Sequence, residues 1–234
     1  MDIIKVKKNR AARNSRKGLA LEAFIQLYST TREAISEVSK LGASESTRQT
    51  LLKAHVINTV TAVEVYYRDI LDFIFRICKH SSYSSNLKRF HDRNYKINDL
   101  IELRKNNIDP LELVANSINF QNIQSIEKIF SILIGTSFFK QVKRQKWRVP
   151  MIKEEIYITE ENINSLQEFF DVRHQLIHNP NSSVVLTEEI ITENLGYTIG
   201  IIISSNMVLM KFIDENIDPS VVTNLTKKTG EILR

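Results

Sequence analysis

One short segment in the last third of the chain combines side chains that could carry out chemistry on a phosphate group. Residues 172–179 read Val-Arg-His-Gln-Leu-Ile-His-Asn, which places Arg173, His174 and His178 close together. An arginine can hold a phosphate through two parallel hydrogen bonds, and a histidine can accept or release a proton near neutral pH. This segment is therefore the first candidate for an active or binding site.

The position of Arg173 on its predicted helix makes it the most informative residue in the chain. Thr159 can cap the beginning of a helix. This helix ends at Asn179, because the next residue is a proline. At about 100° per residue, Arg173 falls in the middle of the apolar arc of this helix. A permanently charged guanidinium cannot remain unpaired among apolar side chains, because its desolvation is too costly. Arg173 must therefore meet an acid, a cleft or a partner subunit.

The same segment resembles the Rx4–6H motif of the HEPN superfamily: an arginine, a polar residue directly after it, and a histidine after four intervening residues. A second segment, residues 61–71, reads Thr-Ala-Val-Glu-Val-Tyr-Tyr-Arg-Asp-Ile-Leu. It is similar to the early helix of HEPN domains in the RiboL-PSP-associated group. The resemblance in order of elements covers about residues 46–216, with the motif before a final long helix.

The resemblance implies a metal-independent endoribonuclease in which the helices around the motif pack against their copy in a second subunit and form a shared cleft. His178 would transfer a proton while an RNA 2′-hydroxyl attacks the adjacent phosphate, and Arg173 would stabilise the charge on the phosphate oxygens. His174 would orient the substrate or act as a second proton-transfer group. The expected products are a 2′,3′-cyclic phosphate and a 5′-hydroxyl end. Family analogy adds a role as a toxin or anti-phage effector.

Two further residues belong to the candidate site, and structural alternatives stand beside all of these roles. Glu64 would line the cleft and orient Arg173, and Asn179 would contact the substrate. Alternatively, Arg173 pairs with a core acid such as Glu64, Glu64 forms a surface pair with Arg68, and His178 is only a favourable cation at a helix end. An ideal helix separates Arg173 from His178 by about 140°. They converge only if the last turn loosens or a partner subunit supplies one of them.

Positive charge is concentrated in two stretches of a chain whose net charge is +5. Residues 1–17 hold seven Lys and Arg against one Asp, and we expect this basic segment to be flexible. Residues 138–153 hold six Lys and Arg and no acid. Three of them are candidate substrate-binding residues, because clustered basic side chains mark contact sites for polyanions such as RNA: Lys140, Lys143 and Arg144. A solvated tail and a solvated helix face would have the same composition.

A bundle of helices is expected to position these residues. Apolar residues between Leu52 and Ile77 recur every three or four positions, which predicts one long helix over about residues 46–79. Further helices are expected over about 18–41, 97–104, 109–118, 122–146, 160–178 and 187–216. Residues 148–158 suggest a small extended insertion, which Trp147 and Phe139 would anchor to the core unless they stack on bases. The predicted fold is all-α, an HEPN-like bundle of four to five main helices with small insertions, in one domain over residues 18–234.

The composition excludes several other classes. Six glycines and four prolines are few for 234 residues, which disfavours a turn-rich all-β fold. No Cys/His cluster has the spacing of metal ligands, and we expect no metal and no cofactor. The longest uncharged run, residues 194–210, has 17 residues, fewer than the roughly 20 of a membrane span, and predicts a buried helix.

We therefore expect a cytoplasmic homodimer that acts on RNA without a membrane, with an antitoxin or regulatory protein as a further partner. The first alternative is an HEPN-like module that binds RNA or a nucleotide without cutting it. The second is a helical interaction protein with no role on nucleic acids. Cleavage requires both Arg173 and His178, so these two residues separate the enzyme from the binding module.

Overall fold

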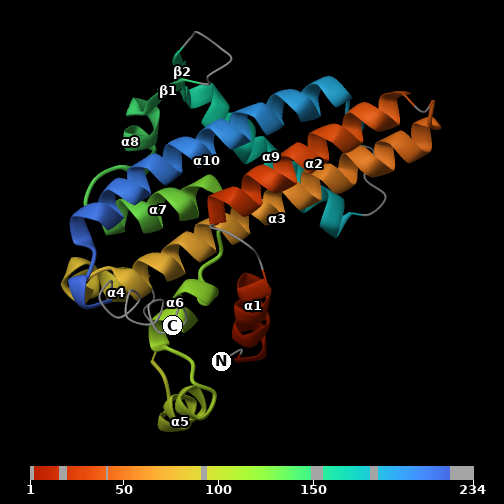
Figure 1. The fold of residues 1–234 in the computed structure, drawn as a ribbon. Coiled ribbons are helices and arrows are strands. Elements are labelled where there is room, and N and C mark those ends of the chain that lie inside the picture. Colours follow the sequence, from red (N-terminus) through yellow and green to blue (C-terminus); the bar gives the residue numbers. More distant parts are fainter. Residues whose placement is uncertain are drawn as a thin grey trace, which may run out of the picture.

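Helices make up most of the chain that the structure describes (Figure 1). This structure, a computed structural model, describes residues 3–15, 20–40, 42–90, 94–148, 155–179 and 184–221. The α-helices are α1 (Ile3–Ser15), α2 (Ala20–Lys40), α3 (Glu45–Ile77), α4 (Leu87–Phe90), α5 (Ile97–Lys105), α6 (Pro110–Ser117), α7 (Ile123–Ile134), α8 (Phe138–Arg144), α9 (Glu160–His178) and α10 (Glu188–Asn216). Two short 3-10 helices, η1 (His80–Ser82) and η2 (Ser84–Asn86), lie between α3 and α4. The all-α prediction is confirmed.

Four long helices, α2, α3, α9 and α10, form the main bundle (Figure 1). Ser44 caps the first turn of α3, since its hydroxyl accepts a hydrogen bond from the backbone N–H of Thr47. The periodic apolar residues of α3 then enter the core, where Tyr66 and Tyr67 are almost completely buried. The Tyr67 hydroxyl shares a 2.9 Å hydrogen bond with the hydroxyl of Ser205 in α10. The predicted long helix is thus the central element of the bundle.

The last helix, α10, is long and apolar enough to cross a membrane by length and composition alone. Its contacts with α2, α3, α8 and α9 are nevertheless those of a core helix. Thr187 caps its first turn, as predicted. Leu186 directly precedes Thr187. The side chain of Gln49 in α3 forms two hydrogen bonds with the backbone of Leu186, at 2.8 Å and 3.0 Å. The end of the α9–α10 connection is thereby fixed to the beginning of α3.

The predicted helix over residues 122–146 is divided in two. Gly135 ends α7 in the left-handed conformation, with φ of 72°, which favours glycine. Ser137 then caps α8, and β1 (Lys146–Arg148) follows and pairs antiparallel with β2 (Glu155–Tyr157). Trp147 anchors this hairpin on α10, because its indole N–H donates to the hydroxyl of Ser204 at 3.2 Å. The described ends of the predicted insertion are therefore extended, while residues 149–154 lie outside the described residues, and Trp147 has the structural role.

Residues 3–15 are helical, although the sequence predicts a flexible basic segment over residues 1–17; residues 1, 2, 16 and 17 lie outside the described residues. Residues 3–15 form α1, which lies beside α6 below the long helices (Figure 1). Val6 is buried in a small second core with Leu103, Ile108 and Leu113. Arg10 forms an ion pair with Glu112 of α6, and Arg13 pairs with Glu112 at 3.2 Å and with Asp72 of α3 at 3.1 Å. These contacts hold α1 against α3 and α6, although its basic composition alone suggests a solvated segment.

Replacing Glu112 with glutamine is expected to lower the free energy of unfolding by about 1–3 kcal/mol at pH 7, because it removes the carboxylate that two arginines share. Burial raises the pKa of Glu112, but its contacts with Arg10 and Arg13 outweigh burial and hold that pKa below its ordinary value of 4.5. A carboxylate with a lowered pKa stabilises the fold above its ordinary pKa, and this contribution is lost as the pH falls through the lowered value.

Urea denaturation at pH 7 and at about pH 3 measures this effect, and the difference between wild type and Glu112→Gln should shrink at the lower pH. Glu102→Gln is the matched control, because Glu102 forms an exposed ion pair with Lys105 at 3.0 Å. It should change stability by less than about 1 kcal/mol. Equal stability of wild type and Glu112→Gln at pH 7 would mean that the ion pairs do not hold α1 in place.

Candidate functional site

Arg173 lies on the side of α9 that faces α3, where it meets an acid. The buried positions of α9 include Ile163, Leu166 and Phe170. Arg173 lies on the same side of the helix, at the edge of the core. Its Nη1 atom is 3.3 Å from Oε1 of Glu64, whose residue is only 8% exposed. Glu64 comes from the early helix that the sequence singled out. The structure therefore brings these two predicted site residues together.

This ion pair leaves hydrogen-bonding capacity unused. Within the described part of the chain, Nε of Arg173 and Oε1 of Glu64 are buried and have no hydrogen-bond partner. A guanidinium carries five N–H donors in a planar fork, so one carboxylate does not use all of them. Glu64 thus fixes the position of Arg173 while donors of the guanidinium stay available to another anion. Buried donors without partners are rare in proteins, and a catalytic role or a bound ion or water is among the explanations for one.

The two histidines of the motif lie against each other on the exposed surface of α9. The rings of His174 and His178 have centroids 4.4 Å apart, with an angle of 49° between their planes. Helix α9 remains α-helical through His178, and the backbone N–H of Asn179 donates to the carbonyl oxygen of Gln175 at 2.8 Å. The last turn therefore does not loosen. His178 and Arg173 project about 140° apart, so one chain pairs His178 with His174 and not with Arg173.

Large aliphatic side chains are exposed around the end of the motif. Ile177 belongs to the last turn of α9, Val185 to the connection, and Ile190 to the first turn of α10, and all three are exposed. A group of exposed aliphatic side chains beside polar ones is typical of a surface that another protein covers. Sequence reasoning missed these residues. Val185 and Ile190 follow the motif in the chain, and nothing in the motif's own spacing indicates that they are exposed.

The basic residues of α8 lie at the other end of α9. Lys143 forms an ion pair with Glu160, the first residue of α9, whereas His178 is its last residue. A helix rises about 1.5 Å per residue, so these two ends are roughly 27 Å apart. Lys140 and Arg144 are exposed on α8. The structure does not bring these predicted substrate-binding residues to the motif of the same chain.

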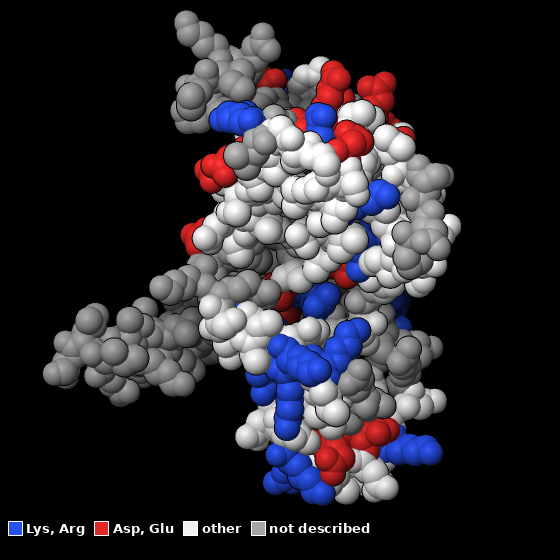
Figure 2. Space-filling view, turned by 90° about the vertical axis from the view of Figure 1, so that its right-hand side faces the viewer, with Lys and Arg blue, Asp and Glu red and all other residues white. Residues whose placement is uncertain are grey.

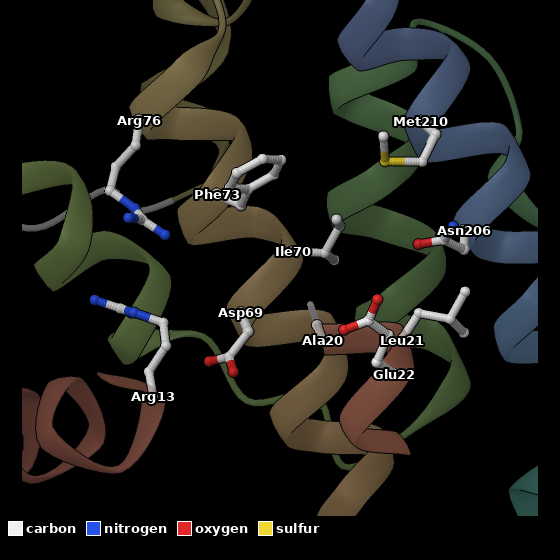
Figure 3. Close-up of a pocket in the computed structure, with 10 residues that line it drawn as sticks. All are labelled: Arg13, Ala20, Leu21, Glu22, Asp69, Ile70, Phe73, Arg76, Asn206 and Met210. Carbon is white, nitrogen blue, oxygen red and sulfur yellow. The ribbon is translucent and has the colours of Figure 1, made fainter. Parts of the chain in front are cut away.

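Other polar features of the molecule lie outside this site. A cavity of about 240 Å³ opens between α1, α2, α3 and α10, and no motif residue lines it. Arg13 and Arg76 reach toward it from one side, and Asn206 and Met210 line the other (Figure 3). His55 of α3 is buried without a hydrogen-bond partner among the described residues, and burial lowers its pKa. No group of three or more His, Cys, Asp or Glu in the described ranges could hold a metal ion.

Comparison with known proteins gives one family and no individual relative. No curated protein and no solved structure matches the chain significantly. The model of the RiboL-PSP-HEPN family matches residues 25–227, a range that contains Glu64 and the whole motif but not α1. The match covers most of the chain and agrees with the all-α bundle described above. The chain therefore belongs to the RiboL-PSP-HEPN family.

Proposed function

We propose that this protein is a metal-independent endoribonuclease whose catalytic groups are Arg173, His174 and His178. Membership of the HEPN family indicates a ribonuclease or a nucleotide-binding module. The observation that favours cleavage is the arrangement of the motif: Glu64 pairs with a guanidinium whose buried Nε has no partner among the described residues, and two histidines lie in contact on the same helix. Binding a phosphate requires only the arginine, whereas moving protons at that phosphate requires histidines.

The reaction needs one proton to leave and one to arrive. A histidine accepts the proton of the RNA 2′-hydroxyl while the 2′-oxygen bonds to the adjacent phosphorus and the bond from phosphorus to the 5′-oxygen breaks. The departing 5′-oxygen takes a proton from a histidine. Arg173 donates hydrogen bonds to the phosphate oxygens, which gain negative charge in the transition state. The products are a 2′,3′-cyclic phosphate and a 5′-hydroxyl end, and His174 and His178 supply the two proton-transfer groups.

The complete site, in this proposal, forms between two copies of the chain. Arg173 and His178 of one α9 point in directions about 140° apart, so a phosphate held by Arg173 is best reached by the partner's His178. The exposed side chains of Ile177, Val185 and Ile190 would be covered in such a homodimer. A cytoplasmic location, an antitoxin or regulatory partner, and a role in toxicity or anti-phage defence are proposed by analogy with the family.

We expect the purified protein to cleave RNA in the presence of EDTA, because no described group of side chains could hold a catalytic metal. Total RNA and a labelled single-stranded oligonucleotide serve as substrates, and the cyclic phosphate end is identified by mass spectrometry. Cleavage that appears only after a divalent metal is added would exclude this mechanism. Tight RNA binding without cleavage would instead favour the non-catalytic module, which the separation of Arg173 from His178 within one chain also allows.

A further inference from the structure

The N-terminal helix α1 has a strongly basic composition that the candidate site does not use. It carries five Lys and Arg and no acid within Ile3–Ser15. It also lies outside residues 25–227, the range that the family model matches. The surface formed by α1 is therefore a feature of this chain that family membership does not explain.

The inward side of α1 uses its charges for docking. Arg10 and Arg13 contact Glu112, and Arg13 also reaches Asp72, which is 1% exposed. Asn9 donates a 2.6 Å hydrogen bond to the side-chain oxygen of Asn116. The two arginines are thus neutralised by buried carboxylates, and the orientation of α1 about its axis is fixed. A helix held in this way keeps the same residues on its outward side.

The outward side of α1 presents lysines and small side chains. Lys5, Lys7, Lys8, Ala11 and Ala12 are exposed, and we call this surface the α1 lysine face. Figure 2 shows blue side chains gathered at the height at which α1 lies in Figure 1. The methyl groups of the alanines leave space beside the lysines, so a phosphodiester chain can approach the helix closely. Within Ile3–Ser15, α1 has no acidic side chain that would repel the phosphates.

We propose that the α1 lysine face holds the phosphodiester backbone of the RNA substrate at a site separate from the motif. The inference rests on the proposed function for the identity of the polyanion. A membrane surface fits less well, because a helix that lies in a bilayer interface needs a broad face of large apolar residues. The outward side of α1 has only Ile4 of that kind. Lysines and alanines carry no pattern that could read bases, so the contact is to phosphates and independent of sequence.

The test measures binding of a labelled single-stranded RNA oligonucleotide over a range of salt concentrations, with His178→Ala present throughout to prevent cleavage. Adding Lys7→Gln and Lys8→Gln should reduce the slope of log affinity against log salt by about 1.4, since each lost phosphate contact on a single strand contributes about 0.7. The affinity at about 0.1 M salt should fall roughly 10-fold or more. Lys7→Arg with Lys8→Arg should keep the original slope.

Lys40→Gln with Lys128→Gln is the matched control, because it removes the same charge from exposed lysines of α2 and α7. It should leave the slope unchanged. An unchanged slope for the α1 variant, while the wild-type protein cleaves the same RNA, would overturn the inference and leave the proposed function intact. Failure of the wild-type protein to bind or cleave RNA would overturn both. Loss of binding to phosphatidylserine vesicles with unchanged RNA affinity would assign the α1 lysine face to membranes and also overturn the inference.

Discussion

Replacing Arg173 or His178 with alanine is expected to reduce the rate of RNA cleavage by about 100- to 10,000-fold in each case. Arg173 supplies hydrogen bonds to charge that develops on the phosphate, and His178 supplies a proton-transfer group. Initial rates on a labelled oligonucleotide measure both losses. His80→Ala is the matched control, because His80 is an exposed histidine outside the motif. A rate within about threefold of wild type for either motif variant would contradict the assignment.

The double variant should be little slower than the slower single variant, because residues that act on one transition state do not contribute independently. If the two losses multiply instead, Arg173 and His178 act in separate steps or at separate sites. Measuring kcat and KM separately for each variant distinguishes an effect on the chemical step from an effect on substrate binding. An effect confined to KM would indicate that Arg173 binds the ground state and the transition state equally well.

Stability measurements separate catalysis by Arg173 from a purely structural role. Arg173→Ala leaves the carboxylate of Glu64 buried without its partner, which should cost about 1–3 kcal/mol of unfolding free energy. Adding Glu64→Gln removes the stranded charge and should restore most of the thermal stability. Cleavage should stay lost in this restored protein. If cleavage returned together with stability, Arg173 would be a structural residue whose loss merely disorders the site.

Much of the fold follows from hydrophobic periodicity, and the exceptions have local or long-range causes. The apolar spacing between Leu52 and Ile77 is sufficient to predict α3, because residues that recur every three or four positions share one face of a helix. The break between α7 and α8 depends on Gly135, and the apolar pattern continues across this residue without indicating a break. The docking of α1 depends on Glu112, 102 residues from Arg10 along the chain, and no local pattern reports that contact.

The candidate site shows the same division. A guanidinium on an apolar arc must find an acid, so the contact between Arg173 and Glu64 was accessible to reasoning about charge burial. The contact between His174 and His178 follows from their spacing of one helical turn. The distance from Lys143 to the motif was not accessible, because it depends on which end of α9 packs beside α8. Clustering of basic residues along a sequence does not give their place relative to a catalytic group.

An equal mixture of Arg173→Ala and His178→Ala subunits is expected to recover about a quarter of the wild-type cleavage rate after exchange, although each variant alone is inactive. Random exchange makes about half of the dimers mixed. In a mixed dimer, one site combines the intact Arg173 of one subunit with the intact His178 of the other, and the second site lacks both residues. A quarter of all sites is therefore complete.

The alternative in which Arg173 and His178 of the same chain act together predicts no recovery, because every site in the mixture then lacks one of the two residues. Subunits with two different affinity tags show whether mixed dimers have formed, and the rate is measured on the doubly purified fraction, where half of the wild-type rate is expected. A mixed dimer without activity would contradict a site shared between subunits. A monomer by light scattering at tens of micromolar, with wild-type activity, would contradict it independently. Recovery in the mixed dimer would instead explain how two side chains about 140° apart on one straight helix serve the same phosphate.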